Sequence, residues 1–304
     1  MLVHVLNTAL PVFAALLMGI LCRKRNVLSC DGVAALRKLA VDITLPAVLF
    51  SAFATADYTP RNMLIPLLTF MLCIAALLLG FMLKKLFACE SKLMPYLMTG
   101  FEAGMLGYGL FALLYPGESS AAFAIVDLGQ VLFVFTVYKG MLMGKGSAKE
   151  LAKQAIASPV LWAIIVGMLF GMTGIYRALQ PSGAASVIDK LAAFIAAPTS
   201  CLILISIGYD LEFRETPWKK VLAYTCMRAA VMAAVFAAAV FVNRQLLGGI
   251  IHEGALLLMI ILPAPYVLPV FSNGREERTD IASTLSVMTL VSLVLFSAMA
   301  AMTA

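Results

Sequence analysis

Long apolar stretches alternate with short polar connections along almost the whole chain. Each stretch holds roughly 20 residues, the length that an α-helix needs to cross a bilayer. The pattern predicts ten spans, at about residues 2–22, 34–55, 62–83, 93–115, 120–143, 156–176, 187–209, 221–242, 255–273 and 280–302. The connections are too short for a soluble domain, so the expected fold is an all-α membrane protein with ten transmembrane helices.

The fourth and the ninth of these spans are interrupted at their middle by residues that a lipid-facing helix does not carry. The first interruption reads Thr99-Gly100-Phe101-Glu102-Ala103-Gly104-Met105-Leu106-Gly107-Tyr108-Gly109, and the second reads Leu262-Pro263-Ala264-Pro265-Tyr266-Val267-Leu268-Pro269. Unwound backbone survives at membrane depth only inside protein or beside a watery cavity. Because matching breaks in two halves point to a transporter's binding site, the pattern predicts a carrier.

The two halves of the chain also share weak matches that occur in the same order. Pro11 precedes Gly19 by eight residues, as Pro159 precedes Gly167. Each half holds five spans, an odd number, so the second half must cross the membrane upside down. We therefore expect two inverted five-helix repeats, residues 1–155 and 156–304.

Composition and charge support this class of protein. Hydrophobic residues make up 62% of the chain and charged residues 12%, about half the ~25% of soluble domains, and the mean hydropathy is +0.99. Of the 22 lysines and arginines, 17 lie in odd-numbered connections, four in even-numbered ones, and Arg228 lies within a span. This spread does not favour a nucleic-acid partner. By the positive-inside rule both termini are expected outside, and the first span is expected to stay uncleaved.

A resemblance to a known family rests on the two interruptions and on two further segments. These are Leu45-Pro46-Ala47-Val48-Leu49-Phe50 in the second span and Asp280-Ile281-Ala282-Ser283-Thr284 in the tenth. Over essentially its whole length the chain resembles the auxin efflux carrier family, within the wider group that includes bile acid:sodium symporters. The resemblance implies a scaffold of spans 1, 2, 6 and 7 and a transport domain of spans 3–5 and 8–10.

What the resemblance implies about function is equally specific. The broken helices four and nine would cross at the substrate site, and the transport domain would move by elevator-type alternating access. The substrates would be small organic anions such as carboxylates, and the protein would lie in a bacterial cytoplasmic membrane, where a homodimer is compatible with the family. Many members carry an asparagine at the first break that is implicated in binding the substrate carboxylate. Here Glu102 stands at that position, and a glycine replaces the family's proline.

Three ionisable side chains within the spans are candidates for chemistry. Glu102 could carry a proton or ligate a cation, or it could be a structural carboxylate that accepts the amides freed by the break. Asp127, with Gln130 on the same helical face, could bind a coupling cation or form an ion pair with Arg228. Arg228 could contact a substrate carboxylate, or it could snorkel toward the cytosol or neutralise Asp127 or Glu102.

The remaining candidates come from the breaks and from the tenth span. Prolines remove backbone donors and leave carbonyls that suit a cation or a donor group on the substrate. Glycines permit irregular dihedrals, although they also serve close helix packing. Hydroxyls along one face of the tenth span could line the pathway or join helices. The candidates of these kinds are Gly104, Gly107, Tyr108, Pro263, Pro265 and Ser286.

Other functions have less support in the sequence. The six cysteines lack metal or CxxC spacing and the two histidines cannot form a His-rich metal site, so neither metal nor cofactor is expected. No catalytic motif of a membrane enzyme is present. Coupling to H⁺ or to Na⁺ stays open, and a sodium-coupled symporter of a small organic solute is the nearest alternative. A channel or a membrane sensor has less need of inverted halves with matching breaks.

Overall fold

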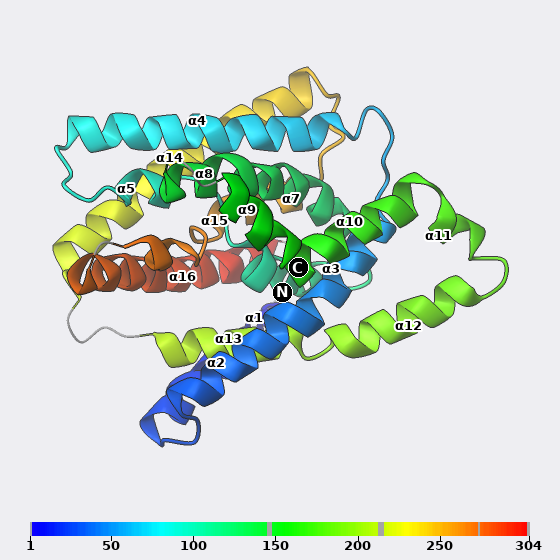
Figure 1. Cartoon of the computed structure of the whole chain (residues 1–304), viewed down its shortest axis with the longest axis horizontal. Coiled ribbons are helices and arrows are strands. Elements are labelled where there is room, and N and C mark those ends of the chain that lie inside the picture. The colour runs from blue at the N-terminus through cyan, green and yellow to red at the C-terminus, as the bar shows by residue number, and fades with distance from the viewer. Residues whose placement is uncertain (1, 145–147, 212–215, 273, 303–304) are drawn as a thin grey trace.

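The computed structural model describes residues 2–144, 148–211, 216–272 and 274–302, and within these ranges the regular elements are all helical (Figure 1). Two of the basic residues counted above, Lys145 and Arg214, lie outside the described residues. The expectation of an all-α protein is therefore confirmed for the described part of the chain.

Helices occupy the predicted apolar stretches of both halves. The first half contains α1 (Leu2–Lys24), α2 (Cys30–Leu39), α3 (Leu45–Ala54), α4 (Leu64–Leu86), α5 (Met94–Leu97), α6 (Tyr108–Leu114), α7 (Ala121–Phe133), α8 (Lys139–Met143) and α9 (Ala148–Ile156). π-helical turns at Ala40–Thr44, Ala103–Gly107 and Val134–Tyr138 precede α3, α6 and α8. The second half contains α10 (Pro159–Met172), α11 (Ile175–Ala178), α12 (Ala184–Ala196), α13 (Thr199–Asp210), α14 (Trp218–Gln245), α15 (Glu253–Ile261), a 3₁₀ turn at Leu268–Phe271 and α16 (Arg275–Met302).

Local sequence signals explain where several helices begin. The Ser29 side chain accepts a hydrogen bond from the Gly32 N–H at the start of α2. Ser158 caps α10 in the same way, and Pro159 follows at the first helical position, where its missing N–H costs nothing. Polar caps and prolines thus mark the ends of helices whose interiors are almost entirely apolar.

Six helical segments among the described residues are long and apolar enough to cross a membrane. They are Asn7–Lys24, Leu64–Leu86, Ala121–Met143, Ala184–Asp210, Trp218–Gln245 and Arg275–Met302. A seventh is added if α9 and α10, which are bent by 72°, count as one broken span. The other predicted spans are shorter, more charged or interrupted, so the count of ten and the inverted repeat stay predictions.

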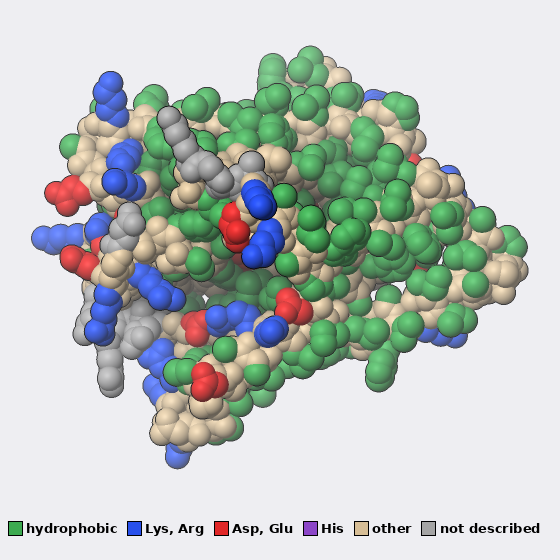
Figure 2. Space-filling model, in the orientation of Figure 1, with side chains coloured by type: hydrophobic (Ala, Val, Ile, Leu, Met, Phe, Trp, Pro, Cys, Tyr) green, Lys and Arg blue, Asp and Glu red, His purple; other side chains and the backbone are tan. Residues whose placement is uncertain are grey.

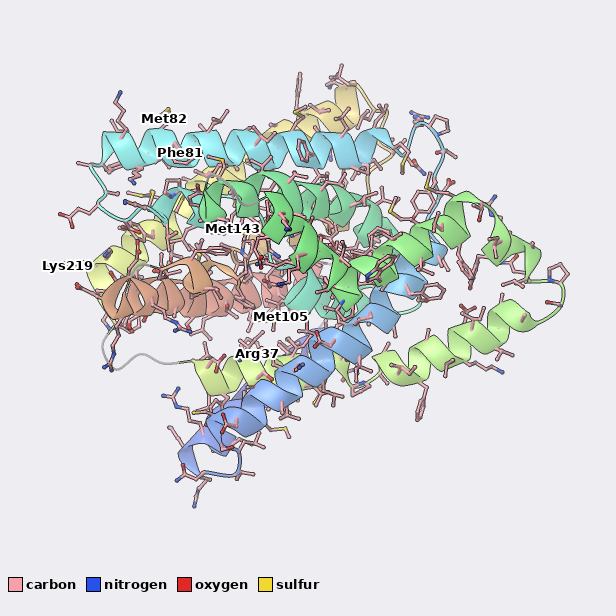
Figure 3. The ribbon with its side chains drawn as sticks, viewed as in Figure 1. Arg37, Phe81, Met82, Met105, Met143 and Lys219 are labelled. Carbon is pink, nitrogen blue, oxygen red and sulfur yellow. The ribbon has the colours of Figure 1, made fainter. Side chains whose placement is uncertain are left out.

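The outer surface of the long helices is apolar. Met82 lies on the outward side of α4 and is 55% exposed, and Phe194 on α12 is 82% exposed (Figure 3). Figure 2 shows hydrophobic side chains spread over the body of the bundle, while lysines and arginines gather at the end where α4 ends and α14 and α16 begin. A continuous apolar surface of this kind indicates contact with lipid.

The connections between helices gather at two opposite ends of the bundle. The odd-numbered connections are joined by hydrogen bonds from Ser91 to Glu277, from Arg37 to Asp210 and from Arg23 to Leu211. The even-numbered connections are joined by contacts of Arg61 with Leu247, His252 with Glu118 and Thr55 with Ser119. We call the second group, at residues 55–63, 115–120, 173–183 and 246–252, the charge-poor end. Connections with many basic residues and connections with few thus lie apart, as the loop charges predict.

The helices pack in two groups. In one group α1 packs on α13, and α3 packs on α10 and α12; in the other α4 packs on α7 and α14, and α14 packs on α15 and α16. The groups also touch each other, since α1 packs on α16 and α3 packs on α7. Glycines allow close approaches in the first group: a Cβ on Gly19 of α1 would lie 2.1 Å from the Ile205 carbonyl oxygen of α13, and a Cβ on Gly167 of α10 would lie 2.8 Å from the Phe50 carbonyl oxygen of α3. Gly19 joins the first span to the seventh, and Gly167 joins the sixth span to the second. Each contact therefore corresponds to the other when the two halves of the chain are interchanged. The division into scaffold and transport domain stays a prediction.

Two features of the helices differ from the expected boundaries. The connection between the fifth and sixth predicted spans contains a helix of its own, α9, which is too short and too polar to be predicted as a span. The seventh predicted span is divided at Ala197 and Pro198 into α12 and α13. Pro198 lacks the N–H that a continuous helix would need there, so a second helix starts in the middle of this span.

Candidate functional site

The two interruptions lie side by side inside the bundle. The backbone N–H of Glu102 donates to the Pro263 carbonyl at 2.9 Å. The Glu102 carboxylate accepts hydrogen bonds from the Met105 N–H at 3.2 Å, in its own break, and from the Tyr266 N–H at 2.8 Å, in the other. Glu102 therefore caps the half-helix that follows it and holds the second break against the first. This is the structural carboxylate of the two alternatives for Glu102; its role in transport stays a prediction.

Glycines bring the two breaks into contact. Gly100 has a φ of +66°, which side chains other than glycine rarely adopt, and a Cβ there would lie 3.0 Å from Cγ of Pro265. A Cβ on Gly107 would lie 2.6 Å from Cζ of Phe123 and 2.9 Å from Cδ1 of Leu262. Both contacts are closer than real Cβ atoms come, so a side chain at position 107 would force Phe123 and Leu262 to shift.

Arg228 reaches the breaks from α14 and is only 4% exposed. Its guanidinium donates to the carbonyl oxygens of Leu97 at 2.6 Å, Gly100 at 2.7 Å and Leu262 at 2.9 Å. It forms no ion pair with Asp127 or Glu102, and it does not extend toward either end of the bundle. The interpretations of Arg228 as a snorkelling residue or as a counter-ion are therefore wrong. The physical reason is that three carbonyls of the breaks lie within reach of the guanidinium and accept its N–H groups.

Other side chains satisfy the rest of the freed backbone. Gln130 on α7 pairs with Phe101 in both directions: its amide NH₂ donates to the Phe101 carbonyl and its Oε1 accepts the Phe101 N–H at 2.5 Å. Ser292 on α16 donates to the Ile261 carbonyl. In an unbroken helix the Ile261 carbonyl would accept a hydrogen bond from residue 265, but Pro265 has no N–H to donate. The carbonyls of Ile261, Leu262 and Pro263 thus each accept a hydrogen bond from within the protein, and their binding of a cation or of a donor group on the substrate stays a prediction.

Asp127 lies behind this network on α7 and is 3% exposed. Its Oδ2 accepts a hydrogen bond from the Tyr108 hydroxyl at 3.0 Å, whereas its Oδ1 is buried and has no hydrogen-bond partner. Gln130, which lies on the same face of α7 as Asp127, forms its hydrogen bonds with Phe101. Asp127 therefore has an oxygen free inside the protein.

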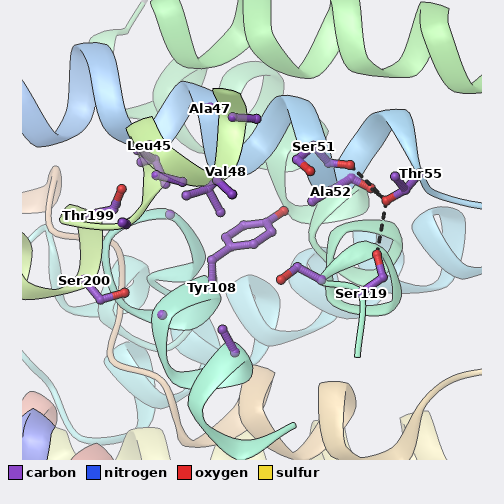
Figure 4. Close-up of a pocket in the computed structure, with 18 of the residues that line it drawn as sticks. Leu45, Ala47, Val48, Ser51, Ala52, Thr55, Tyr108, Ser119, Thr199 and Ser200 are labelled. Atoms are coloured by element: carbon purple, nitrogen blue, oxygen red, sulfur yellow. Dashed lines mark hydrogen bonds between the residues drawn. The ribbon is translucent and has the colours of Figure 1, made fainter. Parts of the chain in front are cut away.

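A cavity of about 560 Å³ lies beside the first break, between α3, α6, α12 and α13. Figure 4 shows the Tyr108 ring in the middle of the lining residues, with Ser51 and Thr55 of α3 on one side and Thr199 and Ser200 of α13 on the other. Among the described residues, the lining contains two acids, Glu118 and Asp189, and no lysine or arginine. Since Glu118 and Ser119 are exposed, the cavity reaches the charge-poor end.

The start of α13 faces this cavity. Thr199 is the first residue of the helix, is 5% exposed, and its Oγ1 is buried without a hydrogen-bond partner. No side chain caps this helix, because the residue before it is Pro198. The free N–H groups of a helix start, together with the positive end of its dipole, favour a negatively charged group. Sequence reasoning missed Thr199 and Ser200, although Pro198 inside an apolar span was a signal for a helix start.

The predicted site residues thus fall into four places. Glu102, Gly107, Gln130, Arg228, Pro263 and Pro265 meet at the contact between the breaks. Gly104 and Tyr108 line the cavity, together with Met105, which Figure 3 labels within the bundle. Asp127 lies behind Tyr108. Ser286 lies on α16 and does not line the cavity, while its neighbours Thr289 and Ser292 bind the second break at Tyr266 and Ile261. Within the described ranges no group of three or more His, Cys, Asp or Glu is placed to hold a metal ion.

One known protein is similar to the chain in sequence. A protein of Methanothermobacter thermautotrophicus named "Uncharacterized transporter" is 25% identical over 220 residues, which cover 68% of each chain. The chain thus resembles a transporter. No family model matches the sequence, so membership of the auxin efflux carrier family stays a prediction. The similarity and the apolar helical fold together indicate a membrane transporter and argue for a role other than catalysis.

Proposed function

We propose that the protein is a carrier of small organic anions that works by elevator-type alternating access across a bacterial cytoplasmic membrane. The observation that carries the proposal is the contact of two broken segments inside an apolar bundle, beside a polar cavity that reaches one end. Broken helices that meet near the middle of a bundle suit a solute site, because they expose helix ends to a buried space.

The cavity also supports an anionic solute, but at the start of α13 and not at the first break, where the resemblance to the auxin efflux carrier family would place it. At the first break the Glu102 carboxylate already caps the half-helix, so a substrate anion would meet a negative charge there. The start of α13, with Thr199 and Ser200, carries no such cap. We infer that the carboxylate of the solute binds at this start. Because no lysine or arginine lines the cavity, a monoanion suits it better than a polyanion.

The two acids of the cavity have partners of their own. The Tyr176 hydroxyl donates to Asp189 at 2.5 Å, and His252 lies 3.3 Å from Glu118. Both contacts lie toward the charge-poor end, whereas Thr199 lies at the break between α12 and α13 in the middle of the seventh span. A carboxylate at Thr199 is therefore held away from both acids, and the acids face the less charged part of the solute.

Movement would take place between the two packing groups. In the proposal the group of α1, α3, α10, α12 and α13 is the scaffold, and the group of α4–α8 and α14–α16 moves. One contact between them at the charge-poor end is the 3.1 Å hydrogen bond between Thr55 and Ser119 (Figure 4). This bond would break when the cavity changes sides. The exchanged contacts at Gly19 and Gly167 support an inverted repeat, with both termini outside.

A ligand screen followed by a transport assay tests the proposal. Purified protein is heated with monocarboxylic acids, dicarboxylic acids, amino acids or sodium salts, and its Tm is measured. A ligand present at 100 times its Kd stabilises the folded state by about 2.7 kcal/mol and therefore raises the Tm. We expect a carboxylic acid to raise the Tm and to show saturable exchange in proteoliposomes. Thr199→Val should abolish the Tm shift, while Thr136→Val, an exposed threonine that bonds its own helix, should preserve it. Conductance far above carrier turnover would instead establish a channel.

A further inference from the structure

The two buried carboxyl groups near the first break have unequal surroundings. Both oxygens of Glu102 accept a backbone N–H, from Met105 and from Tyr266. Asp127 accepts one hydrogen bond, from Tyr108, and its second oxygen is buried with no partner. A negative charge is therefore much better compensated on Glu102 than on Asp127.

The side chains around Asp127 provide no positive charge. From α6 it faces the Tyr108 hydroxyl, from the first break the Glu102 carboxylate, and from α4 the Cys73 thiol. The neighbouring helix α3 has no titratable residue, and in α15 the titratable residue is Glu253, which is exposed and paired with Arg244. Arg228, the buried cation of the site, donates its hydrogen bonds to three carbonyls instead. A charged Asp127 would add a second negative charge beside Glu102 without a counter-ion.

Tyr108 connects Asp127 with the cavity. The same residue that donates to Asp127 Oδ2 also lines the solute cavity, where its ring lies among the lining residues (Figure 4). A shift of α6 against α7 would bring water of the cavity to Asp127. Movement of the break and exposure of this carboxyl group are thereby linked through one side chain.

We propose that Asp127 is the site at which this carrier binds and releases a proton. In the conformation described here Asp127 is the neutral acid. When Tyr108 moves, the O–H bond of Asp127 breaks, the electron pair stays on the carboxylate, and the proton passes to water of the cavity. The inference deepens the proposed function, since it makes the carrier proton-coupled and assigns the proton to Asp127 instead of Glu102, for which the sequence left a proton-carrying role and a structural role open.

Infrared difference spectroscopy tests this without a known substrate. Reconstituted protein is titrated from acidic to alkaline pH, and the C=O stretching band of a neutral carboxylic acid is followed. We expect the wild type to lose one such band as pH rises, Asp127→Asn to lack it, and Glu102→Gln to retain it. A band that persists in Asp127→Asn, or that disappears only in Glu102→Gln, would overturn the proposal.

Two further arms keep the test decisive. If Asp127→Asn does not fold, Tyr108→Phe serves instead: it keeps the acid but removes its hydrogen bond, so the frequency of the band should change. An unchanged band in Tyr108→Phe would contradict the assignment. The titration is repeated with sodium chloride and with choline chloride; if sodium removes the band at constant pH, Asp127 binds sodium and the proton proposal is wrong. A titrating Asp127 in a protein that moves no solute would refute the carrier function alone.

Discussion

Replacing Arg228 with methionine isolates the residue that joins both breaks. The guanidinium donates to Leu97 and Gly100 around the first break and to Leu262 at the second. Methionine has a similar length and fills the space, so the change removes the donors and the charge with little loss of packing. Three buried carbonyls then lose their partner.

The expected loss of stability follows from two opposing terms. A buried polar group left without a partner costs about 1–3 kcal/mol, so three carbonyls give about 3–9 kcal/mol. Removing a buried charge returns part of this, because its desolvation was itself unfavourable. The carbonyls belong to the backbone and cannot be replaced by apolar groups, so the first term dominates. We expect a net destabilisation of about 3–5 kcal/mol, which for a protein of this size lowers the Tm on the order of 10 °C.

The assay is thermal unfolding of purified protein in detergent, with a matched control on the same helix. Arg244 lies on α14 and pairs with Glu253, but both side chains are 61% exposed. An exposed pair contributes about 0–1 kcal/mol, so Arg244→Met should lower the Tm by only a few degrees. Arg228→Lys keeps the charge but not the planar guanidinium, so its Tm should lie between the Tm values of the wild type and Arg228→Met. Equal Tm values for Arg228→Met and Arg244→Met would refute the role of Arg228 as the link between the breaks.

Two further substitutions probe the same contact. Gly107→Ala places a Cβ 2.6 Å from Phe123, so it should lower the free energy of unfolding by about 1–3 kcal/mol and abolish solute exchange. The control Gly140→Ala, whose nearest contact would be an ordinary 3.7 Å to Leu151, should do neither. Normal exchange by Gly107→Ala would contradict the close contact. Gln130→Leu leaves the Phe101 N–H without a partner, while the Phe101 carbonyl keeps the Ala103 N–H, and should lower stability by about 1–3 kcal/mol in thermal unfolding, against an unchanged Gln154→Leu on the exposed face of α9.

The breaks could be predicted from the sequence because their cause is local. Prolines remove donors and glycines permit unusual dihedrals wherever they stand, so Gly100 and Pro263 mark interruptions without knowledge of the fold. The apolar stretches and the asymmetry of the loop charges are also properties of the chain alone. Helix content and the separation of the two kinds of connection followed from them.

The partners of the breaks could not be predicted, because they depend on packing between distant helices. Arg228 lies 131 residues from Leu97, and nothing in its own span shows that a carbonyl of α5 lies within its reach. The cavity was missed for a related reason. Thr199 looks like one more hydroxyl in an apolar span until Pro198 is seen to start a new helix beside the first break.

The bonding of the breaks bears on how the carrier would work. Glu102, Gln130, Arg228 and Ser292 supply from within the protein the hydrogen bonds that the two interrupted segments lack. A junction satisfied in this way need not bind a solute to remain intact, so it can move as one body through the membrane. In the proposed mechanism the solute would bind at Thr199, where a helix start is uncapped, and the proton would bind at Asp127, where one oxygen has no hydrogen-bond partner among the described residues. Because Tyr108 lines the cavity and donates to Asp127, its movement with α6 would couple the two events.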